Sequence, residues 1–165
     1  MSTNLAKLTP IETRAWESLL YLQSSIFREM DRRLTEEHGL PLRWYDVLAT
    51  LDEVPERQLR MNELAANVVL SASRLTRLVQ RLQAEGLVER RPDQRDARAY
   101  FVLLTGAGRH RLEDARKTHH AIARSLLLER LSDGELDDLA RLLRKALEGS
   151  RYMALLEEHV RAAEE

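Results

Sequence analysis

The side chains best suited to chemistry in this chain are hydroxyls and arginines grouped at the start of one predicted helix. They are Ser71, which we expect to cap the helix, and then Ser73, Arg74, Thr76 and Arg77. An α-helix fits the major groove of duplex DNA and presents its first turns to base edges. Hydroxyls at a helix N-terminus suit phosphate oxygens, and arginine reaches guanine or phosphate. The pattern predicts a DNA recognition helix, although arginines on a helix are also typical of a solvated face.

A second group of arginines surrounds a turn between two predicted strands, Leu87–Arg91 and Ala99–Leu104. Its members are Arg90, Arg91, Arg95 and Arg98. An arginine on a protruding turn can enter the narrow minor groove, where the negative potential is strongest. Asp96 would be unfavourable there unless it were paired, and Arg98 is close enough to pair with it and hold the loop. An ordinary charged turn is the alternative, but a basic hairpin after an arginine-bearing helix favours DNA binding.

Positive charge is concentrated around these two groups. The chain has 165 residues and a net charge of −1, which argues against unspecific coating of nucleic acid. From Ser71 to Arg98 seven arginines stand against four acids, so this segment carries +3 and the remainder −4. The distribution of charge along the chain is therefore more informative about function than the net charge.

Several classes of function are disfavoured because the sequence lacks the residues and motifs that they require. Without cysteine there is no disulfide, thiolate zinc site or cysteine redox sensor, and a reducing cytoplasm is the expected location. Uncharged apolar runs are short, so we expect no membrane span and no signal peptide. The common nucleophile, phosphate-loop, dinucleotide and zinc-protease motifs are missing, so we predict that the chain is not an enzyme and uses no cofactor.

The histidines do not predict a metal site. His119 and His120 are adjacent and point about 100° apart on a helix, which prevents them from easily sharing one ion. His110 lies too far along the chain to complete a set. We therefore expect no bound metal.

Long amphipathic helices are predicted at both ends of the chain. Thr9, Pro10 and Glu12 form the start of a helix that runs to about Glu37, with Gly39 as its stop. Its apolar residues recur at helical spacing: Ile11, Ala15, Leu19, Leu22, Ile26, Met30 and Leu34.

After the hairpin the pattern becomes helical again. Thr105 starts one helix, a capping box from Ser132 to Glu135 starts a second, and the tail from Tyr152 is helical in pattern. Between the two ends we predict a series of short elements: a helix from Pro41 to before Pro55, a very short strand around Leu59–Met61, a helix Glu63–Asn67 capped by Asn62, the helix from Ser71 to Gly86, and the hairpin.

These elements predict a mainly α fold with a small β-hairpin wing. We divide it into an N-terminal dimerisation helix (1–39), a DNA-binding domain (40–105) and C-terminal dimerisation helices (106–165). A central unit of this size offers too little surface to cover the terminal apolar stripes. We therefore expect those helices to pack against a second copy in an isologous dimer. A helical cap folded onto its own core is the alternative.

The segment Glu63–Leu82, which contains LSASRLTRLVQRL, resembles the helix-turn-helix of the MarR (multiple antibiotic resistance regulator) family. The resemblance continues through Gly86–Arg90, the wing Asp93–Arg98 and Leu104–Gly108, and extends over nearly the whole chain. It is specific because several elements occur together at the family's spacings. One departure is Val69, in a turn where many helix-turn-helix proteins have glycine.

The resemblance implies a winged helix-turn-helix homodimer that binds a pseudo-palindromic site in double-stranded DNA. Its two recognition helices would enter successive major grooves, with half-sites about 10 base pairs apart. By position, Ser71, Ser73, Arg74, Thr76 and Arg77 match the recognition helix, Arg95 the wing tip, and Asp96 and Arg98 the wing-bracing pair.

The resemblance also implies an effector, because family members commonly release DNA when a small aromatic or anionic molecule binds beside the dimerisation helices. Candidate lining residues are Trp16, His38, Trp44, Tyr45 and His119. Core packing is the alternative for the two tryptophans, and a hydrogen-bonded core position is the alternative for His119.

We therefore expect a dimeric, sequence-specific transcriptional regulator, and by analogy a repressor that an effector releases. A helical dimer that binds another protein and no DNA is the other class considered. The arginine-bearing helix and hairpin argue against it, because a protein-docking face is expected to carry aromatic anchors.

Overall fold

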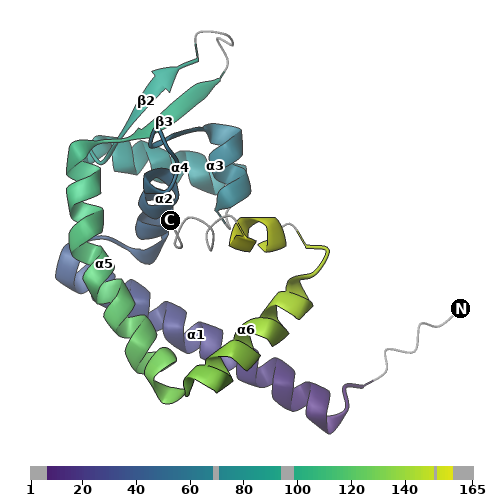
Figure 1. The fold of residues 1–165 in the computed structure, drawn as a ribbon. Coiled ribbons are helices and arrows are strands. Elements are labelled where there is room, and N and C mark those ends of the chain that lie inside the picture. The colour runs from purple at the N-terminus through teal and green to yellow at the C-terminus, as the bar shows by residue number, and fades with distance from the viewer. Residues whose placement is uncertain (1–6, 69–70, 94–98, 151, 158–165) are drawn as a thin grey trace, which may run out of the picture.

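Helices dominate the computed structural model, which describes residues 7–68, 71–93, 99–150 and 152–157 (Figure 1). The elements are α1 (Pro10–His38), α2 (Leu42–Asp52), β1 (Gln58–Arg60), α3 (Met61–Asn67), α4 (Ala72–Ala84), β2 (Val88–Pro92), β3 (Tyr100–Leu104), α5 (Gly106–Leu126), the 3-10 helix η1 (Leu128–Arg130) and α6 (Asp133–Leu147). Residues 152–157 are also helical. This architecture confirms the predicted fold class.

In Figure 1 the short elements gather at one end of the molecule, and the β2–β3 hairpin projects from that end. α5 runs from the base of the hairpin past α2 and packs against α1. None of the helices in the described ranges is long and apolar enough to cross a lipid bilayer.

Local capping signals fix the ends of the long helices as predicted. At the start of α1, the Thr9 N–H donates to Glu12 Oε2 at 2.7 Å, and Glu12 N–H donates to Thr9 Oγ1 at 3.4 Å. Gly39 ends the same helix with φ of 59°, a conformation that glycine adopts without steric cost. At α6, Ser132 and Glu135 form the expected capping box.

One predicted helix start differs from the structure, and a second helix has the predicted N-cap residue without its capping hydrogen bond. α3 begins at Met61, two residues earlier than predicted, because Glu63 Oε2 accepts the N–H of Arg60 at 2.8 Å and moves the cap there. Asn62 therefore lies inside the helix. Ser71 does occupy the N-cap of α4, but its hydroxyl makes no capping hydrogen bond and lies 3.4 Å from Ser73 Oγ.

The three strands form an antiparallel sheet in the order β1-β3-β2. The predicted hairpin is confirmed within one residue at its ends, with Arg90 opposite Val102. The predicted short strand also forms, one residue earlier than expected, and pairs Leu59 with Val102 on the other side of β3.

A continuous apolar core connects the terminal helices to the short elements. Leu34 of α1, Leu48 of α2, Leu82 of α4 and Leu112 of α5 are all fully buried in one cluster. Only the C-terminal part of α1 contributes buried residues, because Ile11, Trp16 and Leu19 in its N-terminal half stay exposed. The predicted domain boundaries, between residues 39 and 40 and between residues 105 and 106, thus separate segments that share one apolar core.

The start of α5 is locked to the turn between α4 and β2. The Thr105 hydroxyl accepts the N–H of Gly108 at 3.0 Å and donates to the carbonyl of Gly86 at 2.7 Å. A Cβ on Gly108 would overlap the carbonyl oxygen of Leu87 and lie 2.9 Å from Cδ1 of Leu104. Only glycine permits this close approach.

Gly108→Ala is therefore expected to lower the free energy of unfolding by about 1–3 kcal/mol, because the added methyl must displace backbone. Gly106→Ala is the matched control, since nothing lies within 4 Å of a Cβ there. Urea unfolding of the two variants measures the difference. Equal stability of both variants would show that the contact at Gly108 is not a constraint.

Candidate nucleic-acid interface

The sequence of α4 places apolar residues on one face and polar residues on the other. Leu75, Val79 and Leu82 recur at helical spacing and are buried against the rest of the fold. The predicted recognition residues Ser71, Ser73, Arg74, Thr76 and Arg77 are all exposed. The structure therefore brings these five side chains together on the solvent side of one helix, directly after α3.

The hairpin beside α4 carries the second group of arginines. Arg90 lies over the ring of Tyr100, with its Cζ 4.6 Å from the ring centroid, and exposed Arg91 lies 3.8 Å from Glu89. The predicted wing-tip residue Arg95 and the predicted wing-bracing pair Asp96 and Arg98 lie outside the described residues. Their roles stay predictions.

A different ion pair holds the base of the hairpin. Asp93 follows β2, its side chain is only 4% exposed, and its Oδ2 lies 2.6 Å from Nη2 of Arg60. The Asp93 N–H donates to the carbonyl of Ala99 at 3.0 Å and closes the two strands. Arg60 also lies over the ring of Phe101 on β3, at 5.4 Å. Because Arg60 precedes α3, the pair ties the helix-turn-helix to the wing.

A second, partly buried carboxylate connects α5 to this unit. Asp52, at the end of α2, accepts hydrogen bonds from Nε of Arg57 at 3.0 Å and from Nη2 of Arg116 at 2.9 Å. Arg109 Nε lies 3.8 Å from Asp52 Oδ1. Burial would raise the pKa of Asp52, but the hydrogen bonds from Arg116 and Arg57 outweigh it and lower that pKa. The carboxylate is thus held ionised among three arginines.

Of the proposed effector residues, the structure brings Tyr45 and His119 into direct contact. Their rings stack with centroids 4.5 Å apart and planes inclined by 12°. Nδ1 of His119 is buried and has no hydrogen-bond partner among the described residues. Burial lowers the pKa of His119, and the nearby positive charges of His120 and Arg116 lower it further.

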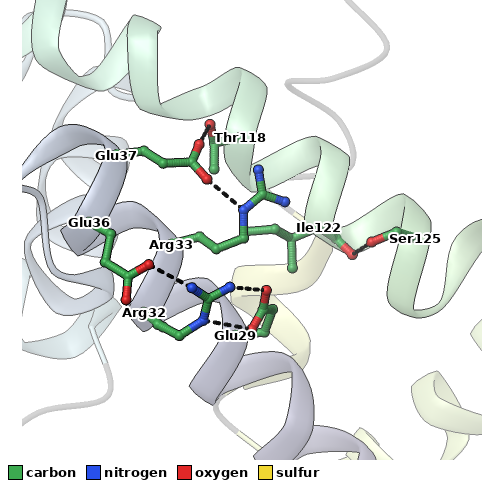
Figure 2. Close-up of polar contacts among 8 residues, drawn as sticks. All are labelled: Glu29, Arg32, Arg33, Glu36, Glu37, Thr118, Ile122 and Ser125. Carbon is green, nitrogen blue, oxygen red and sulfur yellow. Dashed lines mark hydrogen bonds and ion pairs between the residues drawn. The ribbon is translucent and has the colours of Figure 1, made fainter.

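His38 lies beside this pair, in a polar contact between α1 and α5. Figure 2 shows Glu37 of α1 between Arg33 and Thr118: Arg33 Nε donates at 2.6 Å, and the Thr118 hydroxyl donates at 3.0 Å. Nε2 of His38 lies 2.8 Å from the same hydroxyl. Because that hydroxyl gives its proton to Glu37, His38 must donate through Nε2.

The two tryptophans lie elsewhere. Trp16 is on the N-terminal half of α1, where 55% of the residue is exposed, so it is not packed in the core of a single chain. Trp44 is half-buried and lines a hollow beside α4. Among the described residues, neither tryptophan forms a ring contact with the stacked pair of Tyr45 and His119. Within the described residues, no group of three or more potential ligands could hold a metal ion.

Comparison with known proteins matches this chain to one family over its central unit. The MarR family model matches residues 38–99, from the end of α1 to the wing. The solved structure of Sco3205, a MarR family transcriptional regulator from Streptomyces coelicolor in complex with DNA, is 31% identical with a TM-score of 0.82. The similarity covers 90% of this chain and 92% of that one.

Two curated relatives are transcriptional regulators, one an activator and the other a repressor. The transcriptional activatory protein BadR of Rhodopseudomonas palustris is 30% identical over 55% of this chain, and the match spans only 53% of BadR. The transcriptional repressor MprA of Escherichia coli is 26% identical over 78% of this chain and 72% of its own length.

The ion pair at the base of the hairpin gives a first test of the interface. Arg60→Ala removes the guanidinium that lies 2.6 Å from the buried carboxylate of Asp93, so we expect a loss of about 2 kcal/mol in the free energy of unfolding. The double change Arg60→Ala with Asp93→Asn removes the charge as well and should recover part of that loss. Chemical denaturation of the single and double variants measures the recovery; strictly additive losses would contradict the pairing.

Asp46 of α2 gives a test by pH. Burial raises its pKa from 3.8 to about 6, against the opposing charge of Arg43 and with that of Asp31. The folded state therefore binds more protons than the unfolded state between those values, and stability rises as pH falls from about 6 to about 4. Above that range the ionised carboxylate destabilises the fold.

Asp46→Asn should therefore stabilise the protein at pH 7.5. We expect a gain of about 1 kcal/mol, because a side chain that is more than a third exposed keeps much of its hydration. The gain should shrink as the pH falls from 7 to 5. Urea unfolding at pH 7.5, 6 and 5 tests this, and a difference that does not vary with pH would refute the assignment.

Proposed function

The chain belongs to the MarR family of transcriptional regulators, and from this we propose that it acts as a homodimer that binds a pseudo-palindromic operator in double-stranded DNA. Members of the family are transcriptional regulators and not enzymes. The observation that carries the proposal is the exposed face of α4, where hydroxyls and arginines stand beside a projecting hairpin. The similarity of the whole chain to a DNA-bound relative supports it.

In this proposal the side chains divide their roles by position. Ser71, Ser73 and Thr76 make hydrogen bonds to phosphates and base edges, while Arg74 and Arg77 reach guanine or phosphate oxygens. Arg95 enters the flanking minor groove, and Asp96 and Arg98 hold the wing in shape.

The exposed apolar residues of the terminal helices support the dimer. On α1 these include Ile11, 68% exposed, and Tyr21, 72% exposed; Leu142 on α6 is 54% exposed. Such residues on two long helices form a surface that a soluble monomer would leave in water. A second copy can bury them symmetrically. We assign residues 1–39 and 106–165 to dimerisation and 40–105 to DNA binding.

The mode of regulation is the finer part of the proposal. We infer repression, because a small dimer on a promoter can block it without further contacts. We place a small aromatic or anionic effector near Tyr45 and His119, where an aromatic stack and the guanidinium of Arg116 lie between the terminal helices and the DNA-binding unit. The expected setting is the cytoplasm.

Selection from a random duplex library tests the function directly. Purified protein at about 150 mM salt should enrich an inverted repeat whose half-sites lie about 10 base pairs apart. Arg77→Ala should weaken binding to this site roughly 10- to 100-fold and relax the base preference at one position of each half-site, because alanine cannot replace the bidentate hydrogen bonds of arginine to guanine.

Lys117→Ala is the matched control, since it removes an exposed cation on α5, away from α4. This variant should bind as the wild type does. If a protein that sediments as a clean dimer enriches no duplex, DNA binding is not its function. The alternative function, a helical dimer that binds another protein, would then be favoured.

A further inference from the structure

A hollow of about 340 Å³ lies between the start of α2 and one flank of α4. Four arginines line it: Arg43 of α2, and Arg74, Arg77 and Arg81 of α4. The indole of Trp44 and the side chain of Leu78 complete the wall. Arg43 and Arg81 are not among the residues that the sequence analysis assigned to DNA.

The three arginines of α4 share this flank because they are spaced three and four residues apart. Leu75 and Val79 occupy the buried face, so Arg74 and Arg81 lie at the edge between the buried and the exposed faces. All three arginines are exposed, and Trp44 and Leu78 line the same hollow.

Arg43 is positioned from the other side. The N–H of Leu42 donates to Asp31 Oδ1 of α1 at 3.0 Å, which fixes the start of α2. The Arg43 guanidinium lies 4.7 Å from the ring centroid of Phe27, and its Nη1 lies 3.6 Å from Asp46 Oδ2. Its charge is thus held near the hollow by an aromatic ring and a single carboxylate.

The charge around the hollow is unbalanced. Among the described residues, no ion pair is formed by Arg74, Arg77 or Arg81, and Asp46 is the one carboxylate paired with Arg43. Like charges around a small volume repel one another, and an anion placed among them is strongly attracted. The planar fork of arginine is suited to the oxygens of a phosphate.

We propose that Arg43, Arg74 and Arg81 bind one backbone phosphate of the DNA duplex, so that the contact surface extends from α4 onto the start of α2. The inference rests on the proposed function. When a helix lies in the major groove, its flanks face the sugar-phosphate backbones that border the groove. The hollow occupies such a flank and is continuous with the exposed face of α4. Trp44 then forms part of the DNA contact and not of an effector pocket.

Salt dependence distinguishes this role from base reading. The full-length protein is titrated with the selected duplex and with a scrambled duplex between 50 and 300 mM KCl. Arg43→Ala and Arg81→Ala should each weaken binding to both duplexes by roughly tenfold at 150 mM salt. The slope of log K against log salt should fall in each variant, but by less than the roughly 1.8 expected in a dimer for complete loss of one neutralised phosphate per half-site, because two of the three arginines remain.

Conservative variants and a control separate charge from fold. Arg43→Lys and Arg81→Lys keep the charge and should retain most of the slope, while Lys117→Ala should retain all of it. Helical content and dimer mass are checked for every variant. Arg81→Ala is the decisive variant because Arg81 is exposed and has no ion pair in the described structure, so its replacement leaves the fold intact.

A phosphate-specific readout completes the test. A neutral methylphosphonate is placed at successive backbone positions of one half-site. One position should weaken wild-type binding and weaken Arg81→Ala binding less, as expected for two changes that act on the same interaction.

Unchanged affinity and slope in Arg43→Ala and Arg81→Ala, with the wild type binding normally, would overturn the phosphate contact and leave the proposed function standing. A weakening confined to the selected duplex at constant slope would also overturn it, since this indicates base reading. Failure of the wild type to bind any duplex would overturn both.

Discussion

Burial of α5 against both α1 and α2 is the constraint on which the rest of the structure depends. Leu112, Ala115 and Ile122 of α5 are fully buried, and they meet Leu34 of α1 and Leu48 of α2 in one core. Each buried leucine or isoleucine contributes roughly 1.5–3 kcal/mol through removal of apolar surface from water. Helices α1 and α5 and the short elements therefore share one packed core, whereas α6 buries none of its residues in it.

Carboxylates paired with arginines fix how the packed elements are oriented relative to one another. An apolar core fixes which faces are inside, whereas a buried carboxylate accepts only partners that meet it with the right geometry. Asp52 binds arginines from the β1 region and from α5, and Asp93 binds Arg60. These two sites set how α5 and the hairpin stand relative to α4. Leaving either carboxylate unpaired costs more than a surface ion pair is worth.

What the sequence could predict follows from the range of the interactions. The starts of α1 and α6 were predictable because a capping box joins residues only three apart in the sequence. The buried and exposed faces of α4 were predictable because helical periodicity is also a local property. The predicted start of α3 was wrong by two residues. Asn62 is a residue type common at helix N-caps, but in the structure Glu63 accepts the N–H of Arg60 and the helix begins after Arg60.

The contacts that orient the elements could not be predicted in the same way. Arg60 and Asp93, or Asp52 and Arg116, are far apart in sequence, and no spacing rule joins them. A weak signal existed for Asp93, one of three acids in a hairpin rich in arginine. Trp44 was recognised as a functional candidate, yet its side chain lines the hollow beside α4 and not the stack of Tyr45 and His119. Only the fold tells on which side of α2 it lies.

The lock between Thr105, Gly108 and the Leu87 carbonyl has a mechanical consequence. Since hydrogen bonds and a close contact hold the start of α5 against the turn that follows α4, this helix of 21 residues extends from that turn as an arm of about 31 Å. A tilt of about 5° between the arm and its far neighbours would displace the opposite end by about 3 Å. The angle of α5 and the position of the turn after α4 are therefore coupled.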